Sequence, residues 1–245
     1  MTRVSSPPQP VLWRDLGSIP YQEAWDYQEQ LLQQNVRAKA AGHNEQTIHH
    51  LLFCEHPAVI TLGKSGDPGH LLLQENRLRE LGIAFFRTNR GGDITFHGPG
   101  QIVGYPILDL EKIFTDIGRY LRSLEEVIIR TLAEYGITGE RSAGETGVWI
   151  EPQHKLKARK ICAMGVRCSR WITMHGFALN VNTDLNYFNY IIPCGIADKQ
   201  VTSLEKELGY AVPVEEVREK LRQHFEAVFQ VRLAPASHLS AATGT

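Results

Sequence analysis

The segment from Arg90 to Gln101 contains the residue types best suited to binding a small molecule. Its sequence, Arg-Gly-Gly-Asp-Ile-Thr-Phe-His-Gly-Pro-Gly-Gln, sets four glycines around a short apolar run that is typical of a strand. Glycines let the backbone turn sharply and lie close against another body. Arg90, Thr95, His97 and Gln101 supply donors and acceptors that could orient a ligand. The segment predicts a ligand site; the alternative is two tight turns around a strand, with His97 as an ordinary hydrogen-bonded histidine.

Two nucleotide-binding motifs are excluded. Gly98 to Gly100 with Gly104 imitates a dinucleotide fingerprint, but these glycines lead into Ile102 to Ile107, which has the pattern of a strand rather than a helix. Gly63 to Ser65 imitates the end of a phosphate-binding P-loop, yet the glycine required five residues before Gly63 is Ala58. The sequence therefore predicts neither a dinucleotide site nor a Walker-type ATP site.

The cysteines are candidates for core packing or for nucleophilic chemistry. The chain has four, Cys54, Cys162, Cys168 and Cys194, which are too few and too irregular for a disulfide framework. They form no C-x-x-C pair and no histidine couple accompanies them, so we expect no metal site. Cys54 and Cys162 fall within apolar runs, where a cysteine usually behaves as a small buried hydrophobe.

Cys194 is different because it stands between Pro193 and Gly195. Proline fixes the chain direction and glycine allows a turn, so the thiol is expected at a bend that a substrate can reach. Lys160 stands at the edge of another apolar run. If it lies beside Cys194, it would favour the thiolate and could give and take protons. The alternatives are an inert thiol and a lysine that reaches into solvent.

Hydrophobic periodicity indicates the elements that must hold these residues. Apolar stripes and end signals predict helices over Pro20 to about Ala41, Asp116 to Tyr135 and Val214 to Phe229. Strand-like runs are His49 to Cys54, Ala58 to Leu62, Ile83 to Arg87, Ile102 to Leu108, Gly147 to Ile150, Ile161 to Arg167 and Ile172 to Asn182. Strand runs cluster and helices interrupt them irregularly, which favours an α+β domain with a mixed, largely antiparallel sheet and packed helices.

Length and composition bound the class of protein. A chain of 245 residues with 42% hydrophobic content can bury a full core, and we expect one domain over 11–234 between flexible tails at 1–10 and 235–245. The formal net charge of -1 argues against a nucleic-acid partner. No signal peptide and no run of ~18 apolar residues is present, so we expect a cytoplasmic protein without a membrane partner, or an organelle-targeted precursor without its transit peptide.

Taken together and in order, these segments resemble the lipoyl(octanoyl) transferase family, whose fold is that of the biotin and lipoate protein ligase catalytic domain. The resemblance covers nearly the whole chain. It rests on Arg90 to Gly92, Thr95 to Gln101, Gly147 to Ile150, Lys160 to Gly165, His175 to Asn180 and Pro193 to Ile196.

The resemblance implies an acyltransferase of lipoate biosynthesis and protein lipoylation. It would move an octanoyl or lipoyl group from acyl carrier protein to a lysine on a lipoyl domain of 2-oxoacid dehydrogenases or of glycine cleavage H protein, with no cofactor. Cys194 would carry the acyl group as a thioester, assisted by Lys160. Substrate contacts would come from Arg90, Gly91, Gly92, Asp93, Ile94, Thr95, Phe96, His97, Ala163, Met164, Gly165, Gly176, Phe177 and Ala178.

Two departures and two alternatives accompany the resemblance. Phe96 stands where a tyrosine is common in the family, and Cys162 where a small residue is usual. The stretch from Lys155 to Arg170 has six basic residues and no acidic one, which fits either a solvated hairpin or a docking surface for an acidic carrier. The alternative functions are an ATP-dependent lipoate or biotin ligase, which needs no cysteine nucleophile, and a non-catalytic acyl-carrier binding protein.

Overall fold

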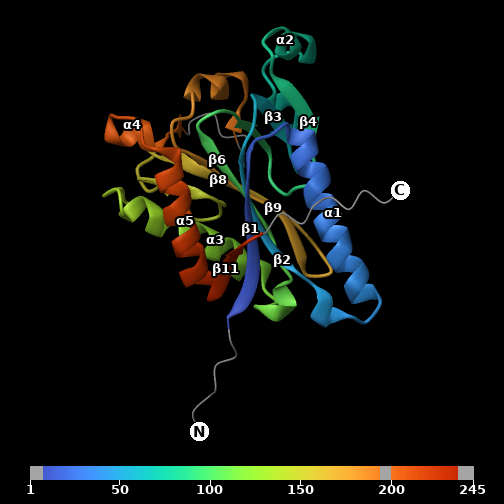
Figure 1. Ribbon diagram of the computed structural model, residues 1–245. Helices are drawn as coiled ribbons and strands as arrows, with labels where there is room; N and C mark the ends of the chain where they lie inside the picture. The colour runs from blue at the N-terminus through green and yellow to red at the C-terminus, as the bar shows by residue number, and fades with distance from the viewer. Residues whose placement is uncertain (1–7, 194–199, 237–245) are drawn as a thin grey trace.

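A mixed eight-stranded sheet is the centre of the computed structural model, which describes residues 8–193 and 200–236. Its strands follow the order β10-β8-β9-β6-β2-β1-β11. Strand β7 pairs with the edge of β8 that is opposite β9. The strands are β1 (Gln9–Ser18), β2 (His49–Glu55), β6 (Gln101–Ile107), β7 (Val148–Ile150), β8 (Arg159–Ser169), β9 (Ile172–Asn180), β10 (Gln200–Val201) and β11 (Val231–Pro235). Figure 1 shows the long strands running side by side through the body of the molecule.

The directions of these strands confirm the predicted sheet. Neighbouring strands are antiparallel along β2, β6, β9, β8 and β7. They are parallel where β1 joins β2 and β11, and where β10 joins β8. The protein is therefore α+β with a mixed, largely antiparallel sheet.

A smaller sheet lies at one end of the large one and has the order β4-β3-β5. In Figure 1 it is at the top, where β3 and β4 are labelled next to the short helix α2. Its own apolar cluster includes Ile60, Phe96 and Phe188. The elements are β3 (Val59–Leu62), β4 (Ala84–Arg87), β5 (Ile94–His97), α2 (Glu75–Glu80) and two 3-10 segments, η2 (Pro68–His70) and η4 (Leu185–Tyr190).

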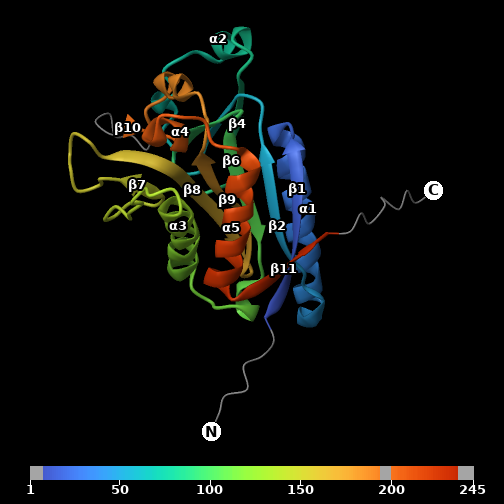
Figure 2. The ribbon, with the colours of Figure 1, turned by 60° about the vertical axis from the view of Figure 1, so that its left-hand side comes forward.

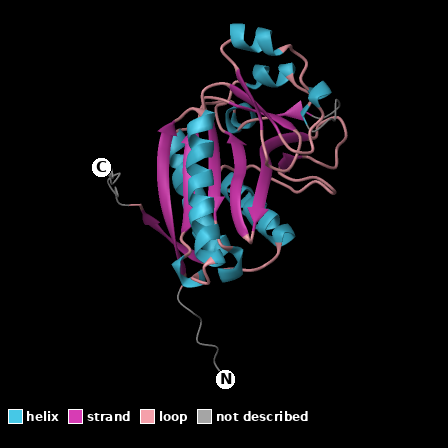
Figure 3. Cartoon of the chain, turned by 90° about the vertical axis from the view of Figure 1, so that its right-hand side faces the viewer, coloured by secondary structure: helices cyan, strands magenta, loops and turns pink. Residues whose placement is uncertain are grey.

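Helices cover both faces of the large sheet. Helix α1 packs on one face, and α3 and α5 pack together on the other, as Figures 1 and 3 show. Two separate apolar clusters fill the two interfaces, because each face of the sheet buries alternate side chains of its strands. The three helices on the sheet faces are α1 (Tyr21–Ala40), α3 (Ile117–Ala133) and α5 (Val214–Phe229). The short helix α4 (Leu204–Leu208) and the 3-10 segments η1 (Asn44–Gln46) and η3 (Leu110–Lys112) complete the described elements.

Helix α3 has a capping residue at its start and a buried apolar stripe, as its sequence predicts. The Asp116 side chain accepts a hydrogen bond from the backbone N–H of Arg119 at 2.9 Å, which caps the helix. Its stripe of Tyr120, Leu124 and Leu132 is fully buried against the sheet and α5. Within the described residues, no helix is long and apolar enough to cross a membrane.

The sequence prediction missed the strands at the far edge of the sheet. Strand β1 begins at Gln9, inside the segment expected to be a flexible tail, and β11 follows α5 directly. The N-terminal part of β1 pairs with β11, for example Val11 with Leu233. This pairing joins residues more than two hundred positions apart, so no local pattern could reveal it.

Candidate active site

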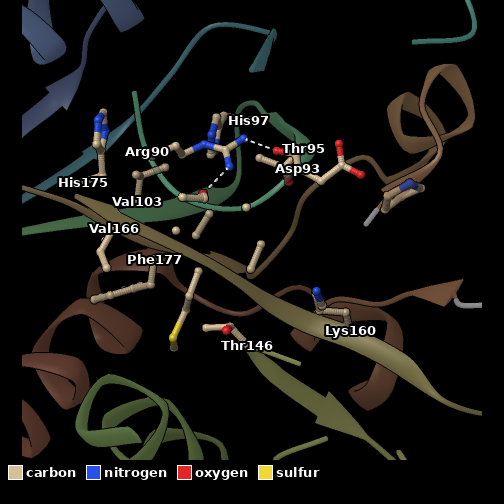
Figure 4. A pocket seen from close by; sticks show the side chains of 18 of the residues that line it. Arg90, Asp93, Thr95, His97, Val103, Thr146, Lys160, Val166, His175 and Phe177 are labelled. Carbon is tan, nitrogen blue, oxygen red and sulfur yellow. Dashed lines mark hydrogen bonds between the residues drawn. The ribbon is translucent and has the colours of Figure 1, made fainter. Parts of the chain in front are cut away.

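A cavity of about 590 Å³ lies between the segment that begins at Arg90 and the strands β8 and β9. Its volume is in the range of small-molecule sites. Figure 4 shows Lys160 at one end and His175, Val166 and Phe177 at the other. Apolar walls with polar groups at defined places suit an elongated, mainly apolar ligand.

Glycines bring the cavity walls together. A Cβ on Gly165 would lie 2.6 Å from the carbonyl oxygen of Gly91, and a Cβ on Gly176 would lie 2.1 Å from that of Gly104. Both contacts are shorter than a real Cβ tolerates. The backbone N–H of Gly91 donates to the carbonyl of Val166 at 2.9 Å, so the loop is bonded directly to the free edge of β8. Within the loop itself, a Cβ on Gly100 would lie 2.6 Å from the carbonyl oxygen of Asn182, so the predicted close approach of a loop glycine is confirmed there.

Arg90 holds this loop in shape. The guanidinium Nη2 donates to the carbonyl of Thr61 at 2.8 Å, to its hydroxyl at 2.9 Å and to the carbonyl of Asp93 at 2.8 Å. The Nη1 atom donates to the carbonyl of Gly91 at 3.1 Å. Figure 4 shows bonds of this kind radiating from the guanidinium into the loop. The planar fork of arginine suits this multiple recognition, which lysine could not reproduce.

His97 belongs to a buried polar network. Its Nδ1 lies 2.8 Å from Oε1 of Gln101, and the Gln101 amide donates to the carbonyl of Phe96 and to Oδ1 of Asn180. Burial lowers the pKa of His97 to about 3. The ring is therefore neutral near pH 7, with its proton on Nδ1 facing Gln101. This geometry agrees with an ordinary hydrogen-bonded histidine that also lines the cavity.

Lys160 is buried rather than turned to solvent. It is 8% exposed, and its Nζ lies 4.5 Å from the centre of the Trp149 ring, the residue that pairs with it across β7 and β8. Its side chain lines the cavity. A lysine in such a place is unusual, because burying an ammonium is costly unless the surroundings compensate for it. The aromatic face of Trp149 supplies part of that compensation.

Cys194 lies outside the described residues, as do Gly195 and Ile196, so its expected bend stays a prediction. The chain that leads to it is described. The backbone N–H of Ile192 donates to the carbonyl of His70 at 2.8 Å, and Pro193 lines the cavity.

His70 belongs to the 3-10 segment η2, which also contacts the loop that begins at Arg90. The Nδ1 atom of His70 lies 2.6 Å from Oδ2 of Asp93. The loop that forms the cavity wall and the chain that precedes Cys194 are thus joined through His70.

The three described cysteines are poor candidates for a nucleophile. Cys54 and Cys162 are completely buried, as expected, and burial raises the pKa of both thiols. Burial also raises the pKa of Cys168, which is partly exposed near the end of β8. Because the thiolate is the reactive form, none of these three is poised for attack near neutral pH.

The structure brings nearly all of the predicted site residues to one cavity. Those that line it are Arg90, Gly91, Gly92, Asp93, Ile94, Thr95, His97, Lys160, Ala163, Met164, Gly165, Gly176, Phe177 and Ala178. Among the predicted site residues that the structure describes, Phe96 is the exception. Its ring stacks on Tyr187 at 4.6 Å in the cluster of the small sheet, because successive side chains of β5 point to opposite faces. Phe96 therefore does not line this cavity, and its substrate contact stays a prediction.

Several lining residues were not predicted as substrate contacts. Tyr21 comes from α1, Leu121 from α3, and Glu145 with Thr146 from the loop before β7. Apolar and aromatic residues on helices carry no sequence signal that distinguishes a cavity wall from a core.

Acidic residues from elsewhere in the chain neutralise part of the basic stretch. Arg159 forms ion pairs at 2.6 Å with both Glu151 and Glu207, and Arg167 pairs with Glu29 at 2.7 Å. Exposed basic residues remain at Arg170 and at the tip of the connection between β7 and β8, which projects from the body in Figure 2 and where Lys157 lies 3.9 Å from Glu151. There Leu156 is 80% exposed between Lys155 and Lys157.

Comparison with known proteins gives a consistent family. The family model described as lipoyl protein ligase A/B catalytic domain matches residues 20–226. An octanoyltransferase of Christiangramia forsetii is 58% identical over 225 residues, which are 90% of this chain and 96% of that protein. An octanoyltransferase of Flavobacterium psychrophilum is 61% identical over 221 residues, 88% and 95% of the two chains.

A solved structure shows the same fold at much lower identity. The bi-partite lipoate protein ligase of Thermoplasma acidophilum superimposes with a TM-score of 0.66 and 16% identity, covering 94% of this chain and 87% of that one. At that identity the likeness concerns the fold alone.

Proposed function

The chain belongs to the lipoyl protein ligase A/B catalytic domain family, and from this premise we propose that it transfers an octanoyl group to a lysine of lipoyl domains. It is an acyltransferase of protein lipoylation. The donor is octanoyl-acyl carrier protein, and the acceptors are the lipoyl domains of 2-oxoacid dehydrogenases and glycine cleavage H protein. The reaction takes place in the cytoplasm.

The first half-reaction moves the acyl group to the enzyme. The Cys194 thiolate attacks the thioester carbonyl carbon, a new carbon–sulfur bond forms, and the bond to the carrier sulfur breaks. Lys160 donates a proton to the departing carrier thiolate. The exchange replaces one thioester with another, so its free energy is nearly balanced.

The second half-reaction moves the acyl group to the acceptor. The amine of the acceptor lysine attacks the carbonyl of the Cys194 thioester, and the Cys194 thiolate leaves as the amide forms. Lys160 takes the proton that the amine releases. Because an amide is more stable than a thioester, the step runs downhill without ATP.

The observation that carries this proposal is the place of Lys160. It is a buried cation at one end of an elongated cavity whose wall also contains Pro193, the residue directly before Cys194. The rest of the cavity has the apolar side chains of Val103, Val166 and Phe177 for an acyl chain. A nearby cation favours the thiolate over the thiol.

The test separates the transferase from an ATP-dependent ligase. Purified protein is given a lipoyl domain with either octanoyl-acyl carrier protein alone or free octanoate with ATP. The proposal expects octanoylation of the lipoyl domain, read by intact mass, only with the carrier-bound donor. Modification that requires ATP and free octanoate would assign the chain to the ligases. No modification, with binding of the carrier, would favour an acyl-carrier binding protein.

A further inference from the structure

His175 has an unusual backbone conformation in the middle of a strand. It belongs to β9, yet its φ of 58° lies in the left-handed region that residues with a side chain rarely adopt. Such a conformation persists only where the surroundings impose it, and it is found most often at functional sites. The position therefore calls for a reason beyond packing.

Two hydrogen bonds hold the His175 residue in place. Its backbone N–H donates to Oε1 of Gln28 at 2.9 Å, and its ring Nε2 donates to Oδ1 of Asn89 at 2.7 Å. The Trp25 ring lies 6.1 Å from the imidazole, centre to centre. Because Asn89 offers a carbonyl oxygen, the ring proton is on Nε2, and Nδ1 carries only a lone pair.

The Nδ1 atom is buried with no hydrogen-bond partner among the described residues. The residue is 1% exposed and lines the cavity, at the end away from Lys160 in Figure 4. Burial, together with the positive charge of Arg90, lowers the pKa of His175 to about 3, so the ring is neutral. A buried acceptor without a donor is costly, so this atom is suited to a neutral donor group on a ligand.

We propose that His175 Nδ1 accepts a hydrogen bond from a hydroxyl near the ω end of the bound acyl group. The enzyme then takes hydroxylated medium-chain acyl thioesters as well as octanoyl. This inference rests on the proposed function, in which the thioester carbonyl lies near Lys160 and the acyl chain runs toward His175. A hydroxyl suits the place because it is small, neutral and compatible with the apolar wall formed by Val103.

The test is the ratio of two specificity constants measured on one enzyme preparation. Transfer to a lipoyl domain is followed with octanoyl thioesters and with 7- and 8-hydroxyoctanoyl thioesters of the same carrier. Because both donors meet the same folded population, the ratio does not depend on how much of a variant is folded. His175→Leu should lower the ratio of the better hydroxyacyl donor to octanoyl about fivefold, the factor that corresponds to one ordinary hydrogen bond.

A second variant separates hydrogen bonding from backbone strain. In His175→Asn the ratio of the specificity constants for the hydroxyacyl and octanoyl donors should stay close to the wild-type value. Asparagine tolerates the left-handed conformation, and its Oδ1 can lie near the position of Nδ1. The matched control is Val166→Ala, which enlarges the same end of the cavity without touching the acceptor and should change both rates together.

Each other outcome has a defined meaning. An unchanged ratio in His175→Leu would overturn the inference while leaving octanoyl transfer intact. Preference of the wild type for an 8-oxo-octanoyl donor over the hydroxyacyl donors would also overturn it, because Nδ1 would then carry the proton. Failure of the wild type to transfer octanoyl would instead defeat the proposed function.

Discussion

Adding one methyl group to Gly165 should disturb both the stability of the fold and the transfer reaction. In Gly165→Ala the new Cβ would meet the carbonyl oxygen of Gly91 at 2.6 Å and Cδ of Arg90 at 3.2 Å. Neither neighbour can yield easily, because Arg90 is fixed by its bonds to Thr61 and Asp93. The loop must therefore move away from β8.

The structure sets the size of the effect. Forcing a methyl group into a packed place costs about 1–3 kcal/mol, and loss of the bond from Gly91 to Val166 adds about 1 kcal/mol. We expect the free energy of unfolding to fall by roughly 2–4 kcal/mol. Displacement of a cavity wall should lower kcat/KM for octanoyl transfer by about 10- to 100-fold.

Urea unfolding and transfer from a small octanoyl thioester to a lipoyl domain are the two assays. The matched control is Gly118→Ala in the first turn of α3, where the new Cβ would lie 3.3 Å from Oδ1 of Asp116, the oxygen that caps the helix. This change should leave transfer intact, and its effect on stability should stay within about 1 kcal/mol because the gain from replacing a helical glycine is opposed by pressure on the cap. If Gly165→Ala behaves like Gly118→Ala in both assays, the loop is not held against β8 as described.

Three further outcomes follow from the same geometry. Lys160→Ala should shift the alkylation profile of Cys194 to higher pH while the protein still folds; an unchanged profile would show that the two side chains are not coupled. Because the pKa of His97 is depressed from 6.5 to about 3 in the fold, the unfolded chain binds a proton more readily, so stability falls as pH drops from about 6.5 toward 3. His97→Gln should reduce that slope by about 1.4 kcal/mol per pH unit in urea titrations, and parallel wild-type and variant profiles would refute the assignment. Reversing the charges of Lys155 and Lys157 should slow transfer from the carrier-bound donor and weaken its salt dependence, whereas equal loss with a small thioester would exclude docking at this tip.

Local patterns were sufficient for elements whose reasons are local. The sequence of helix α3 contains its capping residue, Asp116, and apolar residues at helical spacing in consecutive turns. The position of the helix was therefore predictable to within about one turn. The glycines of the loop after Arg90 predicted close backbone approach, and Gly100 makes such an approach to the carbonyl of Asn182. These features depend on neighbours in the sequence or on glycine itself.

Features decided by distant partners were not predictable in this way. Strand β1 is defined by its pairing with β2 and β11. The apparent surplus of positive charge around Arg159 was cancelled by Glu207, which follows it by nearly fifty residues. In each case the deciding contact exists only in the folded protein.

The central claim is that Cys194 carries the acyl group, and intact-mass analysis tests it most directly. The enzyme is mixed with octanoyl-acyl carrier protein without an acceptor, so that the second half-reaction has no amine to consume the intermediate. The account predicts a mass increase of one octanoyl group, release by hydroxylamine, and a modified peptide containing Cys194, with Cys54, Cys162 and Cys168 unmodified as internal controls. An adduct on another cysteine, or transfer at the normal rate by Cys194→Ala, would contradict the account.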